Sequence, residues 1–367
     1  MKYNWQQSDW PNFQYSTENV EISLYEFSEK AGKISGILES LTEETKSEAI
    51  IELLVSEAIK TSEIEGEYLS RKDVMSSIKN NLGLPTKTVS KDKTAEGISE
   101  LIIDAQKTFK KNLTKESLFA WHKMLMKGNT SIKAGQWRSH QAPMQVVSGA
   151  MGKEKIHYEA PSSKIVPKEM SRFIKWFNQT GRGGEKEIKK PIIRAAVAHL
   201  YFETIHPFED GNGRIGRAVS EKALSQYMGR PILLSLSKAM EGKKKEYYAA
   251  LQLAQRTNEI TPWINYFVKT TITAQKEAAS LIEFTLKKTK FFDQYRNRLN
   301  KRQEKAIRRM LEAGPKGFEG GMNARKYISI CKTSKATATR DLQNLSDRNI
   351  LTQKGGGRST SYFLELE

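Results

Sequence analysis

The residues with the greatest chemical potential stand together in one segment, HPFEDGNGRIGR, at positions 206–217. His206 can accept a proton at neutral pH. Asp210 offers the single carboxylate with which proteins often hold Mg²⁺ beside phosphate oxygens. Gly211 and Gly213 permit backbone conformations in which successive N–H groups point to one side and bind an anion. The segment therefore predicts a site for transfer between phosphate esters, where catalysis comes mostly from positioning and charge stabilisation.

Two predicted helices hold this segment between them. Residues 191–205, PIIRAAVAHLYFETI, form a strongly apolar stretch with proline at the position that helices prefer for their first residue. A second helix begins near Arg214, and its positive N-terminal end favours phosphate. Arg214 and Arg217 are three residues apart and so project from one face. Both helices are apolar on most sides, which predicts a place in the core.

A second pattern, TSEIEG at positions 61–66, lies at the end of a helix predicted over residues 44–65. Thr61 and Glu65 are four residues apart on one face, and Gly66 suits a left-handed C-cap. Glu65 falls in the last turn, where the helix dipole disfavours a negative charge. A carboxylate in such a position often has a cationic partner elsewhere in the chain. Propensity alone, however, favours the alternative, a solvated glutamate on an acidic face.

The segment at 206–217 resembles the Fic motif, HPFx[D/E]GNGRxxR, and matches it at every defined position. In Fic proteins the histidine deprotonates a hydroxyl of a target protein and the acidic residue binds Mg²⁺. The GNG backbone and the asparagine hold the α-phosphate of ATP, and the arginines hold the β- and γ-phosphates. The resemblance implies these roles for His206, Asp210, Gly211, Asn212, Gly213, Arg214 and Arg217. It thus implies transfer of AMP from ATP to a Ser, Thr or Tyr hydroxyl.

The pattern at 61–66 resembles the inhibitory motif [S/T]xxxE[G/N] that many Fic proteins carry on a helix. In those proteins the glutamate pairs with the second arginine of the main motif and blocks the γ-phosphate. The resemblance implies that Thr61, Glu65 and Gly66 form such a motif and that Arg217 is the partner of Glu65. The N-terminal segment is similar to a domain often fused to bacterial Fic cores, through Trp5, Trp10, Pro11, Phe13 and Tyr15.

Fic cores also carry a β-hairpin flap that aligns the target by strand addition. Strand-like runs at residues 144–148 and 155–158 predict this flap over about 145–158; an ordinary surface hairpin is the alternative. Tyr247 and Tyr248 are candidates for stacking on adenine, and we predict that Tyr248 is a nucleotide-binding residue. The alternative is that these helical aromatics belong to the core.

The C-terminal part of the chain is basic: residues 281–367 hold 19 Lys/Arg against 9 Asp/Glu, whereas residues 1–70 hold 5 against 14. Three short helices followed by a β-hairpin predict a winged helix over residues 295–367. Such a domain suggests binding to duplex DNA, with Lys335, Arg340 and Arg358 as contact candidates. A protein-interaction winged helix is the alternative.

The predicted fold is mainly α. It comprises an N-terminal helical domain (1–90), a Fic core with its β-hairpin flap (91–285) and a C-terminal winged helix-turn-helix (295–367), with a basic connector over 287–305. The chain of 367 residues, 38% apolar and 28% charged, has the composition of soluble globular proteins. It has no apolar run of membrane-spanning length, no signal-peptide pattern at its start and one cysteine, Cys331. We therefore expect a cytoplasmic protein without a membrane partner.

The leading functional prediction is an ATP- and Mg²⁺-dependent protein adenylyltransferase that Glu65 inhibits. Removal of AMP from a modified protein, alone or beside the transfer, is one alternative. A transcriptional regulator that uses the Fic core as a sensor is another, although an intact His206 argues against a purely binding role. The target protein is unknown from the sequence, and the resemblance also allows a homodimer.

Overall fold

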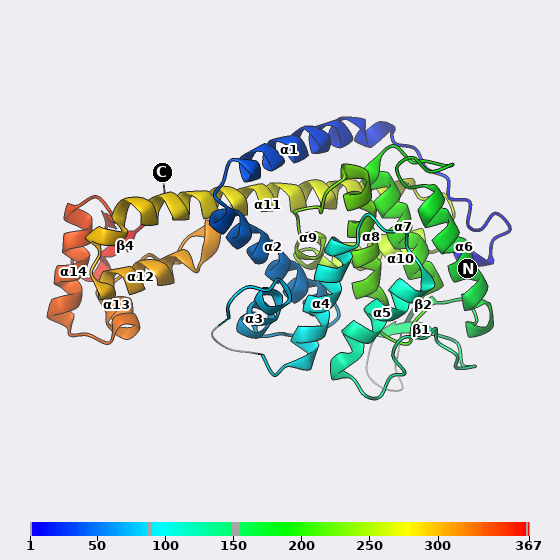
Figure 1. The fold of residues 1–367 in the computed structure, drawn as a ribbon, viewed down its shortest axis with the longest axis horizontal. Coiled ribbons are helices and arrows are strands. Elements are labelled where there is room, and N and C mark those ends of the chain that lie inside the picture. The colour runs from blue at the N-terminus through cyan, green and yellow to red at the C-terminus, as the bar shows by residue number, and fades with distance from the viewer. Residues whose placement is uncertain (1, 87–89, 149–154, 365, 367) are drawn as a thin grey trace. The chain divides into compact units, whose positions relative to one another are not determined.

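The computed structural model describes residues 2–86, 90–148, 155–364 and 366 (Figure 1). Helices account for most of these residues, and the strands are short, which confirms the prediction of a mainly α fold. The chain divides into two compact units, one with Met1–Ser35 and Ile50–Ala278, the other with Gly36–Ala49 and Ala279–Glu367. No helix among the described residues combines the length and the apolar character that crossing a bilayer demands.

Three helices occupy the N-terminal part of the chain. They are α1 (Glu21–Glu39), α2 (Glu43–Ile64) and α3 (Arg71–Asn81). Helix α2 corresponds to the helix predicted over residues 44–65, whereas α1 and α3 have no counterpart among the predicted elements. Helix α3 begins at an N-cap, Ser70, whose side chain accepts a hydrogen bond from the backbone of Asp73.

The aromatic-rich segment before α1 is bound to later parts of the first unit through hydrogen bonds from its indole groups. Trp5 Nε1 donates to the backbone oxygen of Glu159 at 2.9 Å. Trp10 Nε1 donates to the carboxylate of Glu169, also at 2.9 Å. Because each indole has an apolar body and one donor, both residues can be partly buried without leaving that donor unpaired.

The remaining helices of the first unit surround a pair that carries the motif. Every residue of α7 is buried, and most of α8 is buried as well, so these two helices lie in the core as predicted. Helix α8 ends at Gly229, whose φ of 70° gives the left-handed C-cap. The bounds are α4 (Lys93–Lys107), α5 (Lys115–Leu125), α6 (Val166–Gln179), α7 (Pro191–Ile205), α8 (Asn212–Met228), α9 (Leu236–Glu241), α10 (Lys244–Ala254) and α11 (Thr261–Tyr295).

The predicted β-hairpin is present in the first unit. Strand β1 (Gln145–Ser148) pairs antiparallel with β2 (Lys155–Glu159), with an irregularity in register between Val146 and Val147. The predicted turn falls in residues 149–154, outside the described residues. Tyr158 is buried and its hydroxyl donates to the backbone oxygen of Thr204 at 2.5 Å, which ties β2 to the end of α7.

The C-terminal part of the second unit contains three helices and a two-stranded antiparallel sheet. The elements are α12 (Lys301–Leu311), α13 (Ala324–Cys331), α14 (Lys335–Asp347), β3 (Thr352–Lys354) and β4 (Ser361–Phe363). The predicted basic connector over 287–305 is wrong, since α11 continues to Tyr295 and α12 starts at Lys301. The reason is apolar packing: Phe291 belongs to the core of this unit, and Phe292 and Tyr295 pack against it.

Candidate active site

The loop between α7 and α8 starts from an unusual backbone conformation at His206. This residue is the C-cap of α7, with φ 50° and ψ 60°, and its N–H donates to the oxygen of Phe202 at 3.0 Å. A left-handed conformation is uncommon for a residue other than glycine. Pro207 follows and prevents the helix from continuing. The His206 ring therefore lies at the end of α7, with 14% of its side chain exposed.

The loop is closed by the side chain of Asn212. Its Oδ1 accepts a hydrogen bond from the N–H of Phe208, and its Nδ2 donates to the oxygen of Phe208, both at 2.9 Å. The Phe208 ring is buried and stacks on His122, with ring centroids 4.1 Å apart. Both ends of the Asn212 amide are thus engaged inside the loop. The group of Asn212 that is available to bind an anion is therefore its backbone N–H at the start of α8.

Conformation and space both require a glycine at position 211, whereas Gly213 lies against the Glu65 side chain. Gly211 has a φ of 81°, and a Cβ there would lie 2.6 Å from Leu125 Cδ2. A Cβ at Gly213 would collide with the carboxylate of Glu65. At Gly211 the loop therefore approaches α5 more closely than a larger residue permits.

Arg138, which the sequence analysis does not identify, clamps the start of the loop. Its Nε donates to the oxygen of His206 at 2.7 Å, and its Nη2 donates to the oxygens of Ile205, at 3.4 Å, and Pro161. Its backbone N–H donates to Pro207 at 2.9 Å. The residue is buried, and burial lowers the pKa of Arg138 to about 10. It thus satisfies carbonyls that the end of α7 leaves unpaired.

The surroundings of His206 keep its imidazole neutral. Burial and then the positive charge of Arg138 lower the pKa of His206 to about 4. At pH 7 the ring is therefore unprotonated and can accept a proton. The carboxyl of Glu203 lies beside it, with 3.8 Å between Glu203 Oε2 and His206 Nδ1.

Glu203 is a buried carboxyl group that the sequence analysis also does not identify. Burial raises the pKa of Glu203 to about 8; the negative charge of Glu65 adds to the rise and Arg217 opposes it. Its Oε1 has no hydrogen-bond partner among the described residues. A Cβ at Gly216 would collide with this oxygen, so the glycine makes room for the carboxyl group.

Replacing Glu203 with glutamine should change how stability depends on pH. The wild-type folded state keeps a proton that the unfolded state releases above the ordinary pKa of 4.5, so its free energy of unfolding falls as pH rises from 4.5 to about 8. Glu203→Gln lacks this term and should gain stability relative to wild type over that range, by up to roughly 5 kcal/mol at about 1.4 kcal/mol per pKa unit. Urea unfolding of both proteins at about pH 5 and about pH 8 measures the difference; parallel pH dependences would contradict it.

The structure brings the two sequence motifs together at Arg217. Arg217 Nε donates to Thr61 Oγ1 at 2.8 Å, and Nη2 donates to the backbone oxygen of Thr61 at 2.9 Å. Nη2 also pairs with Glu65 Oε1 at 2.7 Å, so the predicted contact is present. The Arg217 side chain is 1% exposed. The φ of 87° at Gly66 turns the chain away directly after Glu65.

Arg214 is held by two carboxylates. Its Nη1 forms an ion pair with Glu67, which the sequence analysis does not identify. Its Nη2 lies 3.5 Å from both carboxylate oxygens of Asp210. The Arg214 side chain is 2% exposed, whereas that of Asp210 is 44% exposed. Asp210 and Glu67 line one hollow of about 450 Å³, together with residues of α4, α5 and the segment after α5.

The carboxylate of Asp210 suits a magnesium ion whose other ligands are water molecules and phosphate oxygens of the substrate. Among the described residues there is no cluster of three or more His, Cys, Asp or Glu that could hold a metal ion. Mg²⁺ keeps several waters and is typically bound by one or two carboxylates plus phosphate oxygens. The exposed Asp210 beside the start of α8 fits this mode.

The remaining predicted residues lie in different surroundings. Tyr248 is partly exposed, and its hydroxyl donates to the oxygen of Ile64 at the end of α2 at 3.2 Å, so it borders the site. Tyr247 is buried with its hydroxyl 2.9 Å from His199 Nε2, which places it in the core. Lys335 and Arg340 belong to α14 in the second unit. The side chain of Arg358 lies outside the described residues.

Comparisons with known proteins identify relatives of the region that carries this loop. Residues 112–224 match the Fic/DOC family, and residues 3–84 match a domain of unknown function, DUF4172. A Fic family protein from Desulfovibrio desulfuricans has a similar structure, with a TM-score of 0.55 at 18% identity, covering 97% of this chain and 98% of that chain. A Fic domain containing signaling protein from Bacteroides thetaiotaomicron has a TM-score of 0.54 at 19% identity, covering 71% and 97%. This chain contains a Fic domain with the Fic fold.

Two curated relatives carry names that describe an activity. The protein adenylyltransferase Fic of Nematostella vectensis is 22% identical over 226 residues, which is 61% of this chain and 48% of the relative. The protein adenylyltransferase fic-1 of Caenorhabditis elegans is 23% identical over 214 residues, 57% of this chain and 38% of the relative. The chain thus matches about half or less of the length of these relatives.

Proposed function

We propose that this protein transfers AMP from ATP to a Ser, Thr or Tyr hydroxyl of another protein. The observation that carries the proposal is the loop itself: a neutral His206 stands beside the N-terminal end of α8, from which Arg214 and Arg217 project. The names of the curated relatives support the same activity. The exposed apolar residues Val147 and Ile156, paired across the hairpin, suit contact with a protein target.

In this proposal each part of the loop has one task. His206 takes the proton of the target hydroxyl as that oxygen forms a bond to the α-phosphorus. The bond from the α-phosphorus to the oxygen that bridges it to the β-phosphorus breaks, and pyrophosphate leaves. The backbone N–H groups of Asn212 and Gly213 stabilise the negative charge on the α-phosphate, whereas that of Gly211 donates to Asp210 Oδ1 at 2.6 Å. Asp210 would hold Mg²⁺, which neutralises part of the phosphate charge when bound.

The contact between Glu65 and Arg217 supports inhibition as part of the same proposal. Arg217 is buried and its Nη2 is engaged by Glu65, so a γ-phosphate must displace this carboxylate to use the arginine. The Glu65 side chain is 28% exposed, and in this proposal it turns outward when ATP binds. The described conformation is thus, in this proposal, the inhibited one.

Removal of AMP from a modified protein is a second candidate activity. The observation that favours it is the closeness of the Glu65 carboxylate to Gly213, where the α-phosphate would bind. In that position Glu65 could orient a water molecule for attack on the phosphorus. A protein that was labelled beforehand would then lose its AMP in the presence of this enzyme.

Isotope position gives the direct test of the transfer. The full-length wild type and Glu65→Gly, which lacks the inhibiting carboxylate, are each incubated with Mg²⁺, a cell lysate and ATP labelled at the α-phosphorus or at the γ-phosphorus, beside the same lysate without added protein. Relative to lysate alone, we expect the added protein to increase protein labelling only with the α-label, and we expect a mass increase of one AMP on the modified peptide. Transfer of the γ-label instead would identify a phosphotransferase and contradict the proposal.

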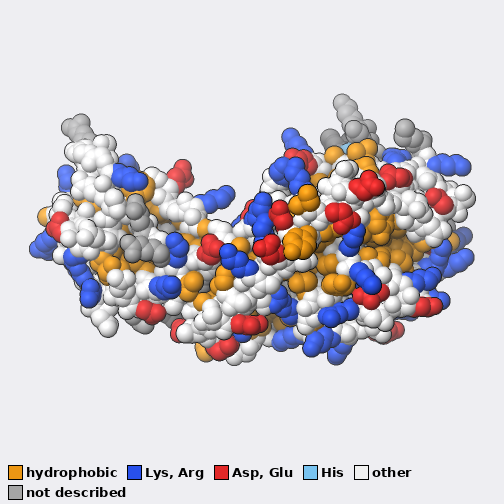
Figure 2. All heavy atoms as spheres, turned by 90° about the horizontal axis from the view of Figure 1, so that it is seen from above, with side chains coloured by type: hydrophobic (Ala, Val, Ile, Leu, Met, Phe, Trp, Pro, Cys, Tyr) orange, Lys and Arg blue, Asp and Glu red, His pale blue; other side chains and the backbone are white. Residues whose placement is uncertain are grey.

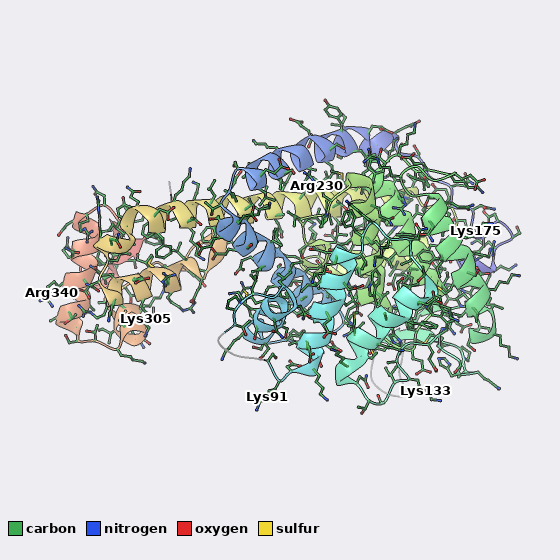
Figure 3. The ribbon with its side chains drawn as sticks, viewed as in Figure 1. Lys91, Lys133, Lys175, Arg230, Lys305 and Arg340 are labelled. Atoms are coloured by element: carbon green, nitrogen blue, oxygen red, sulfur yellow. The ribbon has the colours of Figure 1, made fainter. Side chains whose placement is uncertain are left out.

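We also propose that the C-terminal part of the second unit is a winged helix that binds duplex DNA. Helix α14 begins at the N-cap Ser334 and carries the exposed cations Lys335 and Arg340; Arg340 is labelled in Figure 3. The buried Asp341 on the same helix binds Arg302 at 2.8 Å and accepts from Tyr327 at 3.0 Å, which fixes the rotation of α14. The cations then face outward, as phosphate contacts require.

Charge alone does not locate such a site, because Lys and Arg side chains are spread over the visible face among Asp and Glu (Figure 2). We predict that neutralising Lys335, Arg340 and Arg358 together reduces the salt dependence of DNA binding. The slope of the logarithm of the association constant for duplex DNA against the logarithm of the salt concentration should become less steep by nearly one unit per lost phosphate contact. Neutralising Lys91, Lys133 and Lys175, labelled in Figure 3 and exposed on the first unit, removes the same charge as a control. Equal slopes for the two triple variants, or no DNA binding at low salt, would point to a protein-docking role instead.

A further inference from the structure

The turn that carries Glu65 carries a second carboxylate in a fixed position. The N–H of Glu67 donates to the oxygen of Ser62 at 3.0 Å, and the N–H of Gly66 donates to the oxygen of Glu63 at 3.1 Å. These two hydrogen bonds, with Gly66 in the left-handed conformation, form the Schellman motif that ends a helix. The motif holds Glu65 and Glu67, one on each side of Gly66, in a defined spatial relation.

The two carboxylates engage different arginines of the motif. Glu65 pairs with Arg217, and Glu67 pairs with Nη1 of Arg214. Arg214 is almost fully buried, whereas the Glu67 side chain is 38% exposed, so Glu67 covers the arginine from the solvent side. Burial raises the pKa of Glu67, and the charges of Asp210 and Glu65 oppose its ionisation as well, while Arg214 favours it. A phosphate group that pairs with Arg214 would therefore replace a carboxylate held among other negative charges.

We propose that Glu67 is a specificity-determining residue that controls access of the β-phosphate to Arg214. This inference rests on the proposed function, in which Arg214 and Arg217 bind the β- and γ-phosphates. Glu65 then excludes the γ-phosphate through Arg217, and Glu67 independently excludes the β-phosphate through Arg214. The closed site discriminates against di- and triphosphates but not against a nucleoside monophosphate.

The experiment compares the affinities of AMP, ADP and ATP, each with Mg²⁺, for the full-length protein and its variants by calorimetry. Glu67→Gln keeps the shape of the side chain and removes its charge. We expect it to bind ADP and ATP roughly ten-fold or more tightly than wild type, the effect of losing one competing charge-assisted contact. Its affinity for AMP should stay unchanged. Glu65→Gly should tighten ATP much more than ADP, and the double variant should bind ATP most tightly.

Glu63→Gln is the matched control, because Glu63 lies in the same helical turn and pairs with Lys60 and not with either arginine. It should bind all three nucleotides as wild type does. Thermal unfolding is recorded first, and Glu67→Ala provides a second variant if glutamine disturbs the turn.

The outcomes separate this inference from the proposed function. Suppose that Glu67→Gln leaves the affinity for ADP unchanged or lowers it, while Glu65→Gly still binds ATP more tightly and incorporates AMP. The proposal that Glu67 controls access of the β-phosphate to Arg214 is then wrong, and the proposed function stands. An equal gain for AMP would also overturn the inference, since AMP has no β-phosphate. If no variant binds ATP or incorporates AMP, the proposed function itself fails.

Discussion

Replacing His206 with alanine will lower the rate of AMP transfer by about 10²- to 10⁴-fold, the usual contribution of a general base. His206 stands at the end of α7 with a pKa lowered to about 4, so it is in the form that accepts a proton at pH 7. The fold and ATP affinity should remain nearly unchanged, because the Asn212–Phe208 hydrogen bonds that close the loop do not involve the imidazole. Incorporation of α-labelled AMP over time measures the rate.

His140→Ala serves as the control for this experiment. His140 contacts the backbone oxygen of Ala142 through its ring and takes no part in the loop. The His140→Ala variant should label target protein at the wild-type rate. If His206→Ala labelled equally well, another group would have to be the base, and the assignment of His206 would be wrong.

Replacing Glu65 with glycine will raise AMP incorporation strongly and will tighten ATP binding. The substitution frees Arg217 Nη2 from the carboxylate 2.7 Å away. A hydrogen bond to a charged group contributes about 1.5–3 kcal/mol, which corresponds to roughly ten- to a hundred-fold in ATP affinity. Glycine is tolerated at this position because Glu65 is the last residue before the left-handed Gly66.

Glu65→Gln and Glu63→Gly separate charge from backbone effects. The first removes the charge and keeps the side chain, so it should also be activated; the second puts glycine in the same turn and should not be. Unchanged incorporation by Glu65→Gly would mean that the carboxylate does not compete with ATP. If the protein chiefly removes AMP, Glu65→Gly should instead slow that removal, so both directions are measured on the same variants.

The sequence by itself determined which chemical groups the loop carries, and it predicted the helices that hold the loop. Residues 206–217 are contiguous, so their types and order could be read without knowing the fold. The helix over residues 44–65 followed from apolar periodicity, with Gly66 as its C-cap, and the helix over residues 191–205 followed from a continuous apolar stretch that starts at Pro191. Such signals are local, because capping and helix periodicity depend on neighbours within a few residues.

Only the tertiary structure decided which groups surround the loop. Arg138 donates a hydrogen bond to the backbone oxygen of His206, 68 positions away. Every residue has a backbone oxygen, so the residue types in the sequence give no sign of this contact. Glu67 meets Arg214 across 147 positions. Glu203 lies only three positions before His206 in the sequence, yet its raised pKa comes from burial, which depends on how the helices pack. Charges, distances and desolvation of this kind arise when remote segments come together, and therefore the spacing of residues along the chain could not predict them.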